Sequence, residues 1–369
     1  ASDVYKRQVM AGGGTGGHLY PGIAVAREFL ARNAATVVSF AGTRQGIESR
    51  VVPREGFALD VIRSSGLKGK GLGDRARGAA RLPLSLIDAW RVVSRRRPDL
   101  VIGVGGYSSG PIVMIAALRG IPTMLLEQNA VPGLTNRLLA RMVRAAAVTF
   151  DATQAYFGGK AFVSGNPVRR EFFGDGQPSA EARAHDTRSG IRVLVFGGSQ
   201  GAHAINVAMV EAAPKLASRL PHFRVTHQTG DRDVDMVRAA YQSAGIEAEV
   251  AAFLYDMPVR LAGADLVICR AGATTLAELA AARKASLLIP LPTATDDHQR
   301  VNAEVLSQLG AAEVLLQKDA SGDALADRIV ALASDHTRRQ AMAGAAGALA
   351  RPDAAAAIVN RGLELVRAR

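Results

Sequence analysis

Residues 12–18 read Gly-Gly-Gly-Thr-Gly-Gly-His, and this stretch is the first of three similar ones. Glycine-rich turns recur at 103–110 (Gly-Val-Gly-Gly-Tyr-Ser-Ser-Gly) and at 197–202 (Gly-Gly-Ser-Gln-Gly-Ala), each directly after an apolar run typical of a buried strand. A glycine turn between a strand and a helix presents backbone N–H groups at the positive end of the helix dipole, where phosphate binds or a sugar approaches closely. Three such turns predict two nucleotide-type domains that face a shared cleft.

Strand-like and helix-like segments alternate in both halves of the chain, which predicts parallel βαβ units. The segment 174–190 is rich in Gly, Pro, Ser, Ala and charge, and its composition is typical of a linker. We expect strands at 36–40, 100–102, 123–126, 192–196, 223–227, 249–251, 266–269 and 286–289, and helices at 21–31, 88–97 and 134–143, with further helices around Pro352. The sequence therefore predicts an α/β fold.

The net charge of +12 comes entirely from the first half. Residues 1–160 contain 22 Lys and Arg against 10 Asp and Glu, whereas residues 161–369 contain 23 of each. Ten basic residues lie between Arg63 and Arg97, a pattern typical of proteins that bind nucleic acid or an anionic membrane surface. No nucleic-acid recognition motif accompanies them, and aromatic residues for base stacking make up only 5% of the chain. We therefore expect no nucleic-acid partner.

Other features limit the class of protein. A chain of 369 residues is long for one core and suits two domains. Cys269, the only cysteine, lies in a strand pattern and is interpreted as a buried filler, and the lack of a possible internal disulfide favours a reducing cytoplasm. No run of 18 apolar residues predicts a membrane span. Because Lys6-Arg7-Gln8 put polar groups where a buried first strand is expected, we interpret residues 1–8 as a truncated or foreign start.

The first glycine turn admits more than one interpretation. It satisfies the dinucleotide pattern G-x-G-x-x-G, but the second expected strand ends Ser39-Phe40-Ala41-Gly42-Thr43 without the acidic residue that would hold a ribose. His18 follows the turn at a helix start, where the dipole favours the neutral imidazole that a general base needs. The alternative is a histidine that only hydrogen-bonds the loop.

Acidic residues in the second half have functional and structural interpretations. Glu278 stands one turn into the helix that follows 266–269, where its carboxylate could accept two ribose hydroxyls; a capping or solvent-facing role is the alternative. Asp231-Arg232-Asp233 resembles the metal-binding Asp-x-Asp of some glycosyltransferases, and Asp296-Asp297-His298 could be taken for a metal cluster. Both lie where a helix is expected to begin, so we predict helix caps and no metal.

The stretch 82–93 carries apolar residues at helical spacing, namely Leu82, Leu86, Trp90 and Val93. Such a face usually packs into a core. Basic residues flank it on both sides, including Arg91, so a helix lying on a membrane surface is the competing interpretation.

Taken together, these segments resemble the MurG family of bacterial N-acetylglucosaminyltransferases. The resemblance runs in family order from residue 12 to about 303. It rests on the strings 12–18 with Tyr20-Pro21-Gly22, 65–71, 105–111, Glu127-Gln128-Asn129, Leu134-Thr135-Asn136, 165–169, 197–202, 270–278 and 297–303.

The resemblance implies a GT-B glycosyltransferase with two Rossmann-like domains, at 1–162 and 163–350, and a C-terminal helix at 351–369 that crosses back to the first. The donor would be UDP-N-acetylglucosamine. The acceptor would be undecaprenyl-diphospho-N-acetylmuramoyl-pentapeptide (lipid I), held by the first domain at the cytoplasmic face of the bacterial membrane. Inverting transfer to the C4 hydroxyl of the muramoyl sugar would give lipid II for peptidoglycan synthesis, with no cofactor.

The resemblance also implies site residues. His18 would be the catalytic base, and the acceptor side would include Gly105, Gly106, Tyr107 and Ser108. The membrane patch would comprise Leu82, Leu86, Trp90 and Arg91. Donor contacts would fall on Thr15, Gly16, Gly17, Asn129, Arg169, Ser199, Leu254, Ala273, Thr274, Thr275, Leu276, Ala277, Glu278 and Gln299.

Two alternatives remain within the same fold. One is a sugar transferase that acts on diacylglycerol. The other is a UDP-N-acetylglucosamine epimerase, which would convert the donor with no acceptor present.

Overall fold

The computed structural model describes residues 6–64, 72–174, 190–198 and 201–368. The chain forms two compact units, one of residues 1–169 with 351–369 and the other of residues 170–350. The first unit ends at Arg169 rather than at residue 162, because β7 (Ala161–Val163) pairs with β6 at the edge of the first sheet. Most of the expected linker and the string 65–71 lie outside the described residues.

The first unit is built on a parallel sheet of seven strands in the order β3-β2-β1-β4-β5-β6-β7. The strands other than β7 are β1 (Arg7–Gly12), β2 (Val37–Gly42), β3 (Ala58–Val61), β4 (Leu100–Gly105), β5 (Thr123–Glu127) and β6 (Ala145–Val148). Helices cover both faces, as a buried parallel sheet requires. They are α1 (Gly16–Arg32), α2 (Glu48–Arg54), α3 (Leu72–Arg96), α4 (Ser109–Leu118), α5 (Leu134–Leu139) and α14 (Ala354–Arg367), with short 3₁₀ turns η1 (Asp151–Tyr156) and η2 (Gly158–Lys160).

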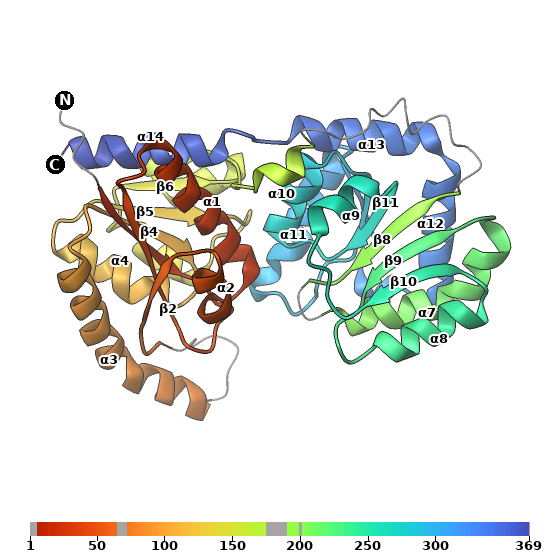
Figure 1. Cartoon of the computed structure of the whole chain (residues 1–369), viewed down its shortest axis with the longest axis horizontal. Helices are drawn as coiled ribbons and strands as arrows, with labels where there is room; N and C mark the ends of the chain where they lie inside the picture. Colours follow the sequence, from red (N-terminus) through yellow and green to blue (C-terminus); the bar gives the residue numbers. More distant parts are fainter. Residues whose placement is uncertain (1–5, 65–71, 175–189, 199–200, 369) are drawn as a thin grey trace. The chain divides into compact units, whose positions relative to one another are not determined.

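Alternate residues of the central strands enter two separate cores. Met10 packs with side chains of α1 and α14, whereas its neighbours Val9 and Ala11 pack against α3 and α4. Figure 1 shows α14, close to the C-terminus in sequence, lying beside α1. Arg32 of α1 donates a hydrogen bond to the Ala356 carbonyl of α14 at 3.2 Å, which links the two helices at the surface.

The second unit repeats this plan with a parallel sheet of six strands in the order β10-β9-β8-β11-β12-β13. The strands are β8 (Arg192–Phe196), β9 (Arg224–Gln228), β10 (Glu247–Ala251), β11 (Leu266–Cys269), β12 (Ser286–Leu288) and β13 (Glu313–Val314). The helices are α7 (His203–Arg219), α8 (Val234–Ser243), α9 (Met257–Gly263), α10 (Ala273–Ala281), α11 (His298–Gln308), α12 (Gly322–Ser334) and α13 (His336–Ala348), with 3₁₀ turns η3 (Arg170–Phe173), η4 (Thr295–Asp297) and η5 (Gln317–Asp319). One core joins the sheet to α7, α8 and α12.

In each sheet the strand order reverses direction between two central strands, and ligands of such sheets bind at the carboxyl ends of those strands. The pair is β1 and β4 in the first sheet and β8 and β11 in the second. The three glycine turns follow β1, β4 and β8, and the segment 270–278 follows β11. The predicted class, two α/β domains with parallel sheets, is confirmed.

The start of the chain differs from the expectation. Arg7 and Gln8 do form part of β1, because their backbone pairs with β2 on one side and β4 on the other. The ladder hydrogen bonds therefore outweigh the unsuitable side chains. Gln8 is 1% exposed in the centre of the sheet.

Candidate active site

The glycine turns after β1 and β4 interlock. Gly13 N–H donates to the Gly105 carbonyl at 3.2 Å. A Cβ atom at Gly12 would lie 2.2 Å from the Gly105 oxygen, and one at Gly106 would lie 2.6 Å from the Gly13 oxygen. The positive φ angles at Gly12 (132°), Gly105 (106°) and Gly106 (79°) also favour glycine. Only glycine at these positions allows the two backbones to approach so closely.

A buried carboxylate forms hydrogen bonds with the glycine turn that follows β1. Glu48, the first residue of α2, is completely buried. Its Oε2 accepts a hydrogen bond from Gly14 N–H at 2.7 Å, and its Oε1 accepts from the Thr43 N–H at 2.7 Å and the Thr43 hydroxyl at 2.8 Å. Three donors thus compensate for burying the charge, and they fix the turn relative to the end of β2.

His18 lies in the first turn of α1, directly against the turn that follows β4. A Cβ atom at Gly105 would lie 2.6 Å from His18 Nδ1, so the imidazole occupies the space that a side chain would fill. His18 Nδ1 is also 3.1 Å from Gln128 Oε1, and Gln128 Nε2 donates to the Val104 carbonyl at 3.0 Å. The Nδ1 end of the ring is therefore held both by Gln128 and by the turn at Gly105.

The residues that follow β5 are organised by Glu127. This carboxylate is 2% exposed and accepts hydrogen bonds from Asn129 N–H at 3.0 Å, Gly133 N–H at 3.1 Å and Asn136 Nδ2 at 2.8 Å. Asn129 Nδ2 adds a longer bond to the same carboxylate at 3.3 Å. Glu127 therefore positions Asn129, one of the predicted donor contacts.

Other predicted residues of the first unit lie around α1. The guanidinium of Arg169 lies 5.3 Å from the centre of the Tyr20 ring, and Tyr20 is two residues after His18 in the chain. Tyr107 is exposed, whereas Ser108 is 2% exposed, so its side chain is buried beside the turn. Thr15 precedes α1 without capping it through its side chain, and Gly16 and Gly17 are the first residues of the helix.

In the second unit, Gln228 connects two predicted contact regions. Its Nε2 donates to the Gly198 carbonyl in the turn after β8 at 2.8 Å, and its Oε1 accepts from Leu254 N–H at 2.9 Å. Gln228 is 2% exposed at the end of β9. Ser199, the predicted contact in this turn, lies outside the described residues.

The segment after β11 opens α10 with Gly272 in an extended conformation before the first helical residue. Ala273 and Leu276 are buried, whereas Thr274, Thr275, Ala277 and Glu278 are half-buried. Ala273 and Leu276 can therefore meet a ligand through the backbone, and the other four can also use their side chains. Gln299 accepts the N–H of Leu291 at 3.0 Å and so holds the loop after β12.

The comparisons with known proteins decide the family. Residues 8–148 match the N-terminal domain of glycosyltransferase family 28, and residues 192–358 match its C-terminal domain. A Myxococcus xanthus protein named UDP-N-acetylglucosamine--N-acetylmuramyl-(pentapeptide) pyrophosphoryl-undecaprenol N-acetylglucosamine transferase is 46% identical over 359 residues, which are 97% of this chain and 92% of the relative. The crystal structure of Acinetobacter baumannii MurG has a TM-score of 0.78 at 30% identity and covers 97% of this chain and 99% of that chain. The chain belongs to the MurG family.

The membership makes this protein a glycosyltransferase of family 28. A UDP-GlcNAc 2-epimerase from Neisseria meningitidis has a TM-score of 0.68 but only 12% identity, over 97% of this chain and 100% of that chain, so that likeness shows a shared fold alone.

Two predicted helix caps in this MurG-family chain were wrong in their chemistry. Asp233 precedes α8, but its side chain makes no capping bond; it accepts from Asn206 Nδ2 at 2.8 Å and lies 2.9 Å from His203 Nδ1. Burial alone would raise the pKa of Asp233, but the hydrogen bonds from Asn206 and His203 outweigh it, so the pKa is lowered. Asp297 precedes α11 with φ of 54° and pairs with Arg300 instead of capping.

The remaining acidic and sulfur groups have structural surroundings. Among the described residues, no three His, Cys, Asp or Glu side chains gather as a metal site would require. Cys269 is fully buried, as predicted, and burial raises the pKa of its thiol, so it stays protonated. Arg270 beside it donates to the carbonyls of Ile289 and Pro290, which joins the ends of β11 and β12.

Sequence reasoning missed the buried polar residues that hold the site, namely Glu48, Gln128 and Gln228. Gln128 belongs to a string that carried the resemblance, yet its role could not be inferred from the string. The available signal was a polar residue at the carboxyl end of an expected strand, since such a residue needs a partner when it is buried.

Proposed function

We propose that this glycosyltransferase moves N-acetylglucosamine from UDP-N-acetylglucosamine to the C4 hydroxyl of the muramoyl sugar in lipid I, which gives lipid II. The observation that carries the proposal is the imidazole of His18, held at the N-terminus of α1 against the Gly105 turn in a chain 46% identical to transferases of that name. The reaction is a single displacement with inversion at the anomeric carbon.

His18 is the proposed general base. The acceptor oxygen forms a bond to C1 of N-acetylglucosamine, and the bond from C1 to the β-phosphate oxygen of UDP breaks. The hydroxyl proton passes to His18 Nε2, while the bonding electron pair leaves with UDP. Gly105, Gly106, Tyr107 and Ser108 form the proposed acceptor side, with the buried Ser108 acting through its backbone.

The charge that develops on UDP needs fixed donors. The N-terminus of α10 is suited to a diphosphate, since the first N–H groups of a helix point outward at the positive end of its dipole. Glu278 is the proposed ligand of the ribose. Leu254 and Gln299 are further proposed donor contacts of the second unit. Thr15, Gly16, Gly17, Asn129 and Arg169 are the proposed donor contacts of the first unit, and Arg169 would supply positive charge.

The deciding assay combines the purified protein with radiolabelled UDP-N-acetylglucosamine and a lipid I analogue, and measures disaccharide product. We expect His18→Ala to lower turnover about 10²- to 10⁴-fold with nearly unchanged donor affinity. His336→Ala, which removes an exposed histidine of the second unit, is the matched control. Near-normal turnover of His18→Ala would refute the base assignment, and conversion of the donor without acceptor would indicate an epimerase.

We also propose that the first unit binds an anionic membrane surface through α3. Between residues 82 and 96, the part of α3 whose side chains the structure describes, four apolar side chains are exposed, among them Trp90 at 54%; the others are Leu82, Leu84 and Ile87. Leu86 is half-buried, and Val93 faces the core, so the exposed stripe differs from the one the spacing predicted. No helix among the described residues has the length and apolar character needed to cross a bilayer.

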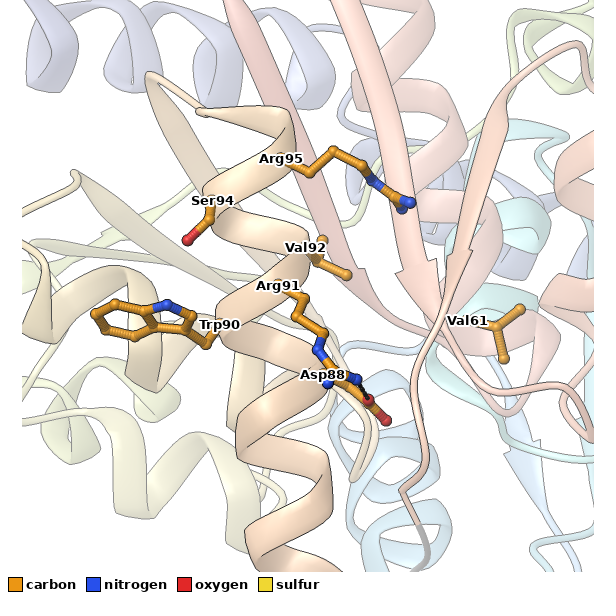
Figure 2. A pocket seen from close by; sticks show the side chains of 7 residues that line it. All are labelled: Val61, Asp88, Trp90, Arg91, Val92, Ser94 and Arg95. Atoms are coloured by element: carbon orange, nitrogen blue, oxygen red, sulfur yellow. Dashed lines mark ion pairs between the residues drawn. The ribbon is translucent and has the colours of Figure 1, made fainter.

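The charges around this stripe are partly neutralised within the protein. Asp88 pairs with Arg63 and Arg91, and the hydrogen bond from Arg63 lowers its pKa. Figure 2 shows Trp90 on one side of α3 and Arg91 with Asp88 on the other. These side chains line an open depression of about 570 Å³ along the helix, and because they diverge they do not enclose a ligand chamber. Arg119 lies 4.8 Å from the Trp90 ring and brings a cation to the apolar side.

Binding to vesicles tests the membrane proposal. Each engaged Lys or Arg contributes about 1 kcal/mol at an anionic surface, and this part is screened by salt, whereas the apolar part is not. We expect the emission of Trp90, the only tryptophan, to shift to the blue with anionic vesicles, and binding to fall with added salt without vanishing. In sedimentation, Trp90→Ala should bind less than Leu309→Ala, which removes an exposed leucine of the second unit. Emission that ignores lipid would refute the assignment to α3.

A further inference from the structure

Gln128 lies between the His18 imidazole and the backbone of β4. It directly follows β5, the neighbour of β4 in the sheet, and is 2% exposed. Its side-chain amide makes two contacts, at 3.0 Å to the Val104 carbonyl and at 3.1 Å to His18 Nδ1. Both partners are fixed, one by the sheet and the other by the first turn of α1.

The chemistry of these partners determines where the histidine proton lies. The Val104 carbonyl can only accept, so the amide nitrogen of Gln128 must face it. The amide oxygen then faces His18 Nδ1, and because this oxygen can only accept, Nδ1 must carry a hydrogen. In a neutral imidazole, the lone pair is consequently on Nε2.

We propose that Gln128 is a positioning residue that holds His18 in the tautomer with the proton on Nδ1, the form whose Nε2 can take the proton of the acceptor hydroxyl. The proposal rests on the proposed function of His18 as base. The ring has little freedom to escape this arrangement, because its Nδ1 side also packs against Gly105, where a Cβ atom would lie only 2.6 Å away. When Nε2 takes the proton, the Nδ1–H bond to Gln128 persists and still orients the imidazolium.

A spectroscopic test reads the tautomer without any substrate. The full chain is labelled with ¹⁵N-histidine, and the His18 signals among the seven histidines are assigned by their loss in His18→Ala. We expect a protonated Nδ1 and an unprotonated Nε2 at pH above the titration of the ring. Gln128→Met removes the acceptor at similar size and should move the population toward the Nε2–H form.

Gln8→Met is the matched control, since it also replaces a buried glutamine of the first sheet, but one whose amide atoms meet no hydrogen-bond partner in the described part of the chain. The His18 tautomer should be the same in this variant as in the wild type. A wild-type His18 with the proton on Nε2, or a Gln128→Met protein with an unchanged tautomer, would overturn the proposal.

Kinetics separate a positioning role from a structural one. We expect Gln128→Met to lower kcat about 10-fold or more, by less than His18→Ala does, with the donor dissociation constant unchanged. In the His18→Ala background the same change should have almost no further effect, since the group through which Gln128 acts is already absent. Equal fold-losses in both backgrounds would overturn the proposal.

The tautomer measurement and the kinetics together distinguish a failure of the Gln128 proposal from a failure of the proposed function of His18. If His18→Ala retains normal turnover while the ¹⁵N shifts change as expected, Gln128 sets the tautomer and the base assignment is wrong. If His18→Ala is inactive and the ¹⁵N shifts ignore Gln128→Met, the base assignment stands and the positioning role is refuted.

Discussion

Replacing Gln8 should stabilise the protein. The residue lies in β1 with its backbone in register with Val38 and Leu100 of the two neighbouring strands. Those two residues belong to the core that also contains Met10, so the amide is inserted among apolar side chains. Both its nitrogen and its oxygen are buried, and neither finds a hydrogen-bond partner among the residues that the structure describes.

The magnitude follows from the cost of such an amide. Protein substitutions place the burial of an unpaired amide or hydroxyl at about 1–3 kcal/mol. Methionine is similar in length and flexible enough to fill the same space, so little strain should offset the gain. We therefore expect Gln8→Met to raise the free energy of unfolding of the first unit by about 1–3 kcal/mol.

Urea unfolding followed by tryptophan emission provides the assay. Trp90 is the only tryptophan and lies on α3 of the first unit, so its emission reports this unit. The midpoint should rise at an unchanged slope. Gln242→Met, at an exposed position of α8, is the control and should stay within about 0.5 kcal/mol of the wild type. A Gln8→Met protein no more stable than the wild type would show that the amide is satisfied in solution and would refute the reasoning.

Three further changes test other parts of the structure. Glu278→Ala should weaken UDP binding by about 1–3 kcal/mol in titration calorimetry, since it leaves ribose hydroxyls without their acceptor, and unchanged affinity would contradict the assignment. Glu48→Gln should destabilise the first unit by roughly 2–4 kcal/mol in the urea assay, because an amide nitrogen would face backbone or hydroxyl donors. Glu364→Gln, at an exposed position of α14 in the same unit, is its control, and equal stability of both variants would contradict the role of Glu48. Burial lowers the pKa of His227 to about 3, so the unfolded chain binds the extra proton and stability should fall as pH drops from about 6.5 towards 3, by roughly 4–5 kcal/mol at most. His227→Gln should reduce this loss on acidification even if it is less stable at pH 7, and an identical pH dependence would contradict the prediction.

The sequence was most informative where one kind of residue dominates a segment. Buried parallel strands are continuous apolar runs, so the expected strand at 266–269 matches β11 and that at 192–196 matches β8. It was less informative where composition misleads. The strand β6 is Ala-Ala-Ala-Val, which has high helix propensity, and it forms because β5 and β7 pair with it. Likewise α5 ends at Leu139 instead of continuing to residue 143.

The candidate site divides in the same way. The glycine turns could be located from the sequence, because tight turns and helix starts are local features. The groups that hold them could not, because each contact joins distant positions. Glu48 is 34 residues from Gly14, and Gln128 is 110 residues from His18. Only the strand order brings these pairs together, and no local pattern encodes which buried polar group will meet which turn.

In both sheets the side-chain amide of a buried glutamine makes the contact that holds a residue of the candidate site. Gln128 follows β5 beside β4, and Gln228 ends β9 beside β8. In each case the amide nitrogen donates to a carbonyl of the neighbouring strand or of the turn that follows it, Val104 or Gly198. The amide oxygen faces a group of the candidate site, His18 Nδ1 or Leu254 N–H. A carboxylate could serve the N–H partner but would repel the carbonyl, and a lysine could serve only the carbonyl. An amide offers a donor on one atom and an acceptor on another at the end of a flexible side chain, so glutamine suits this place in each sheet.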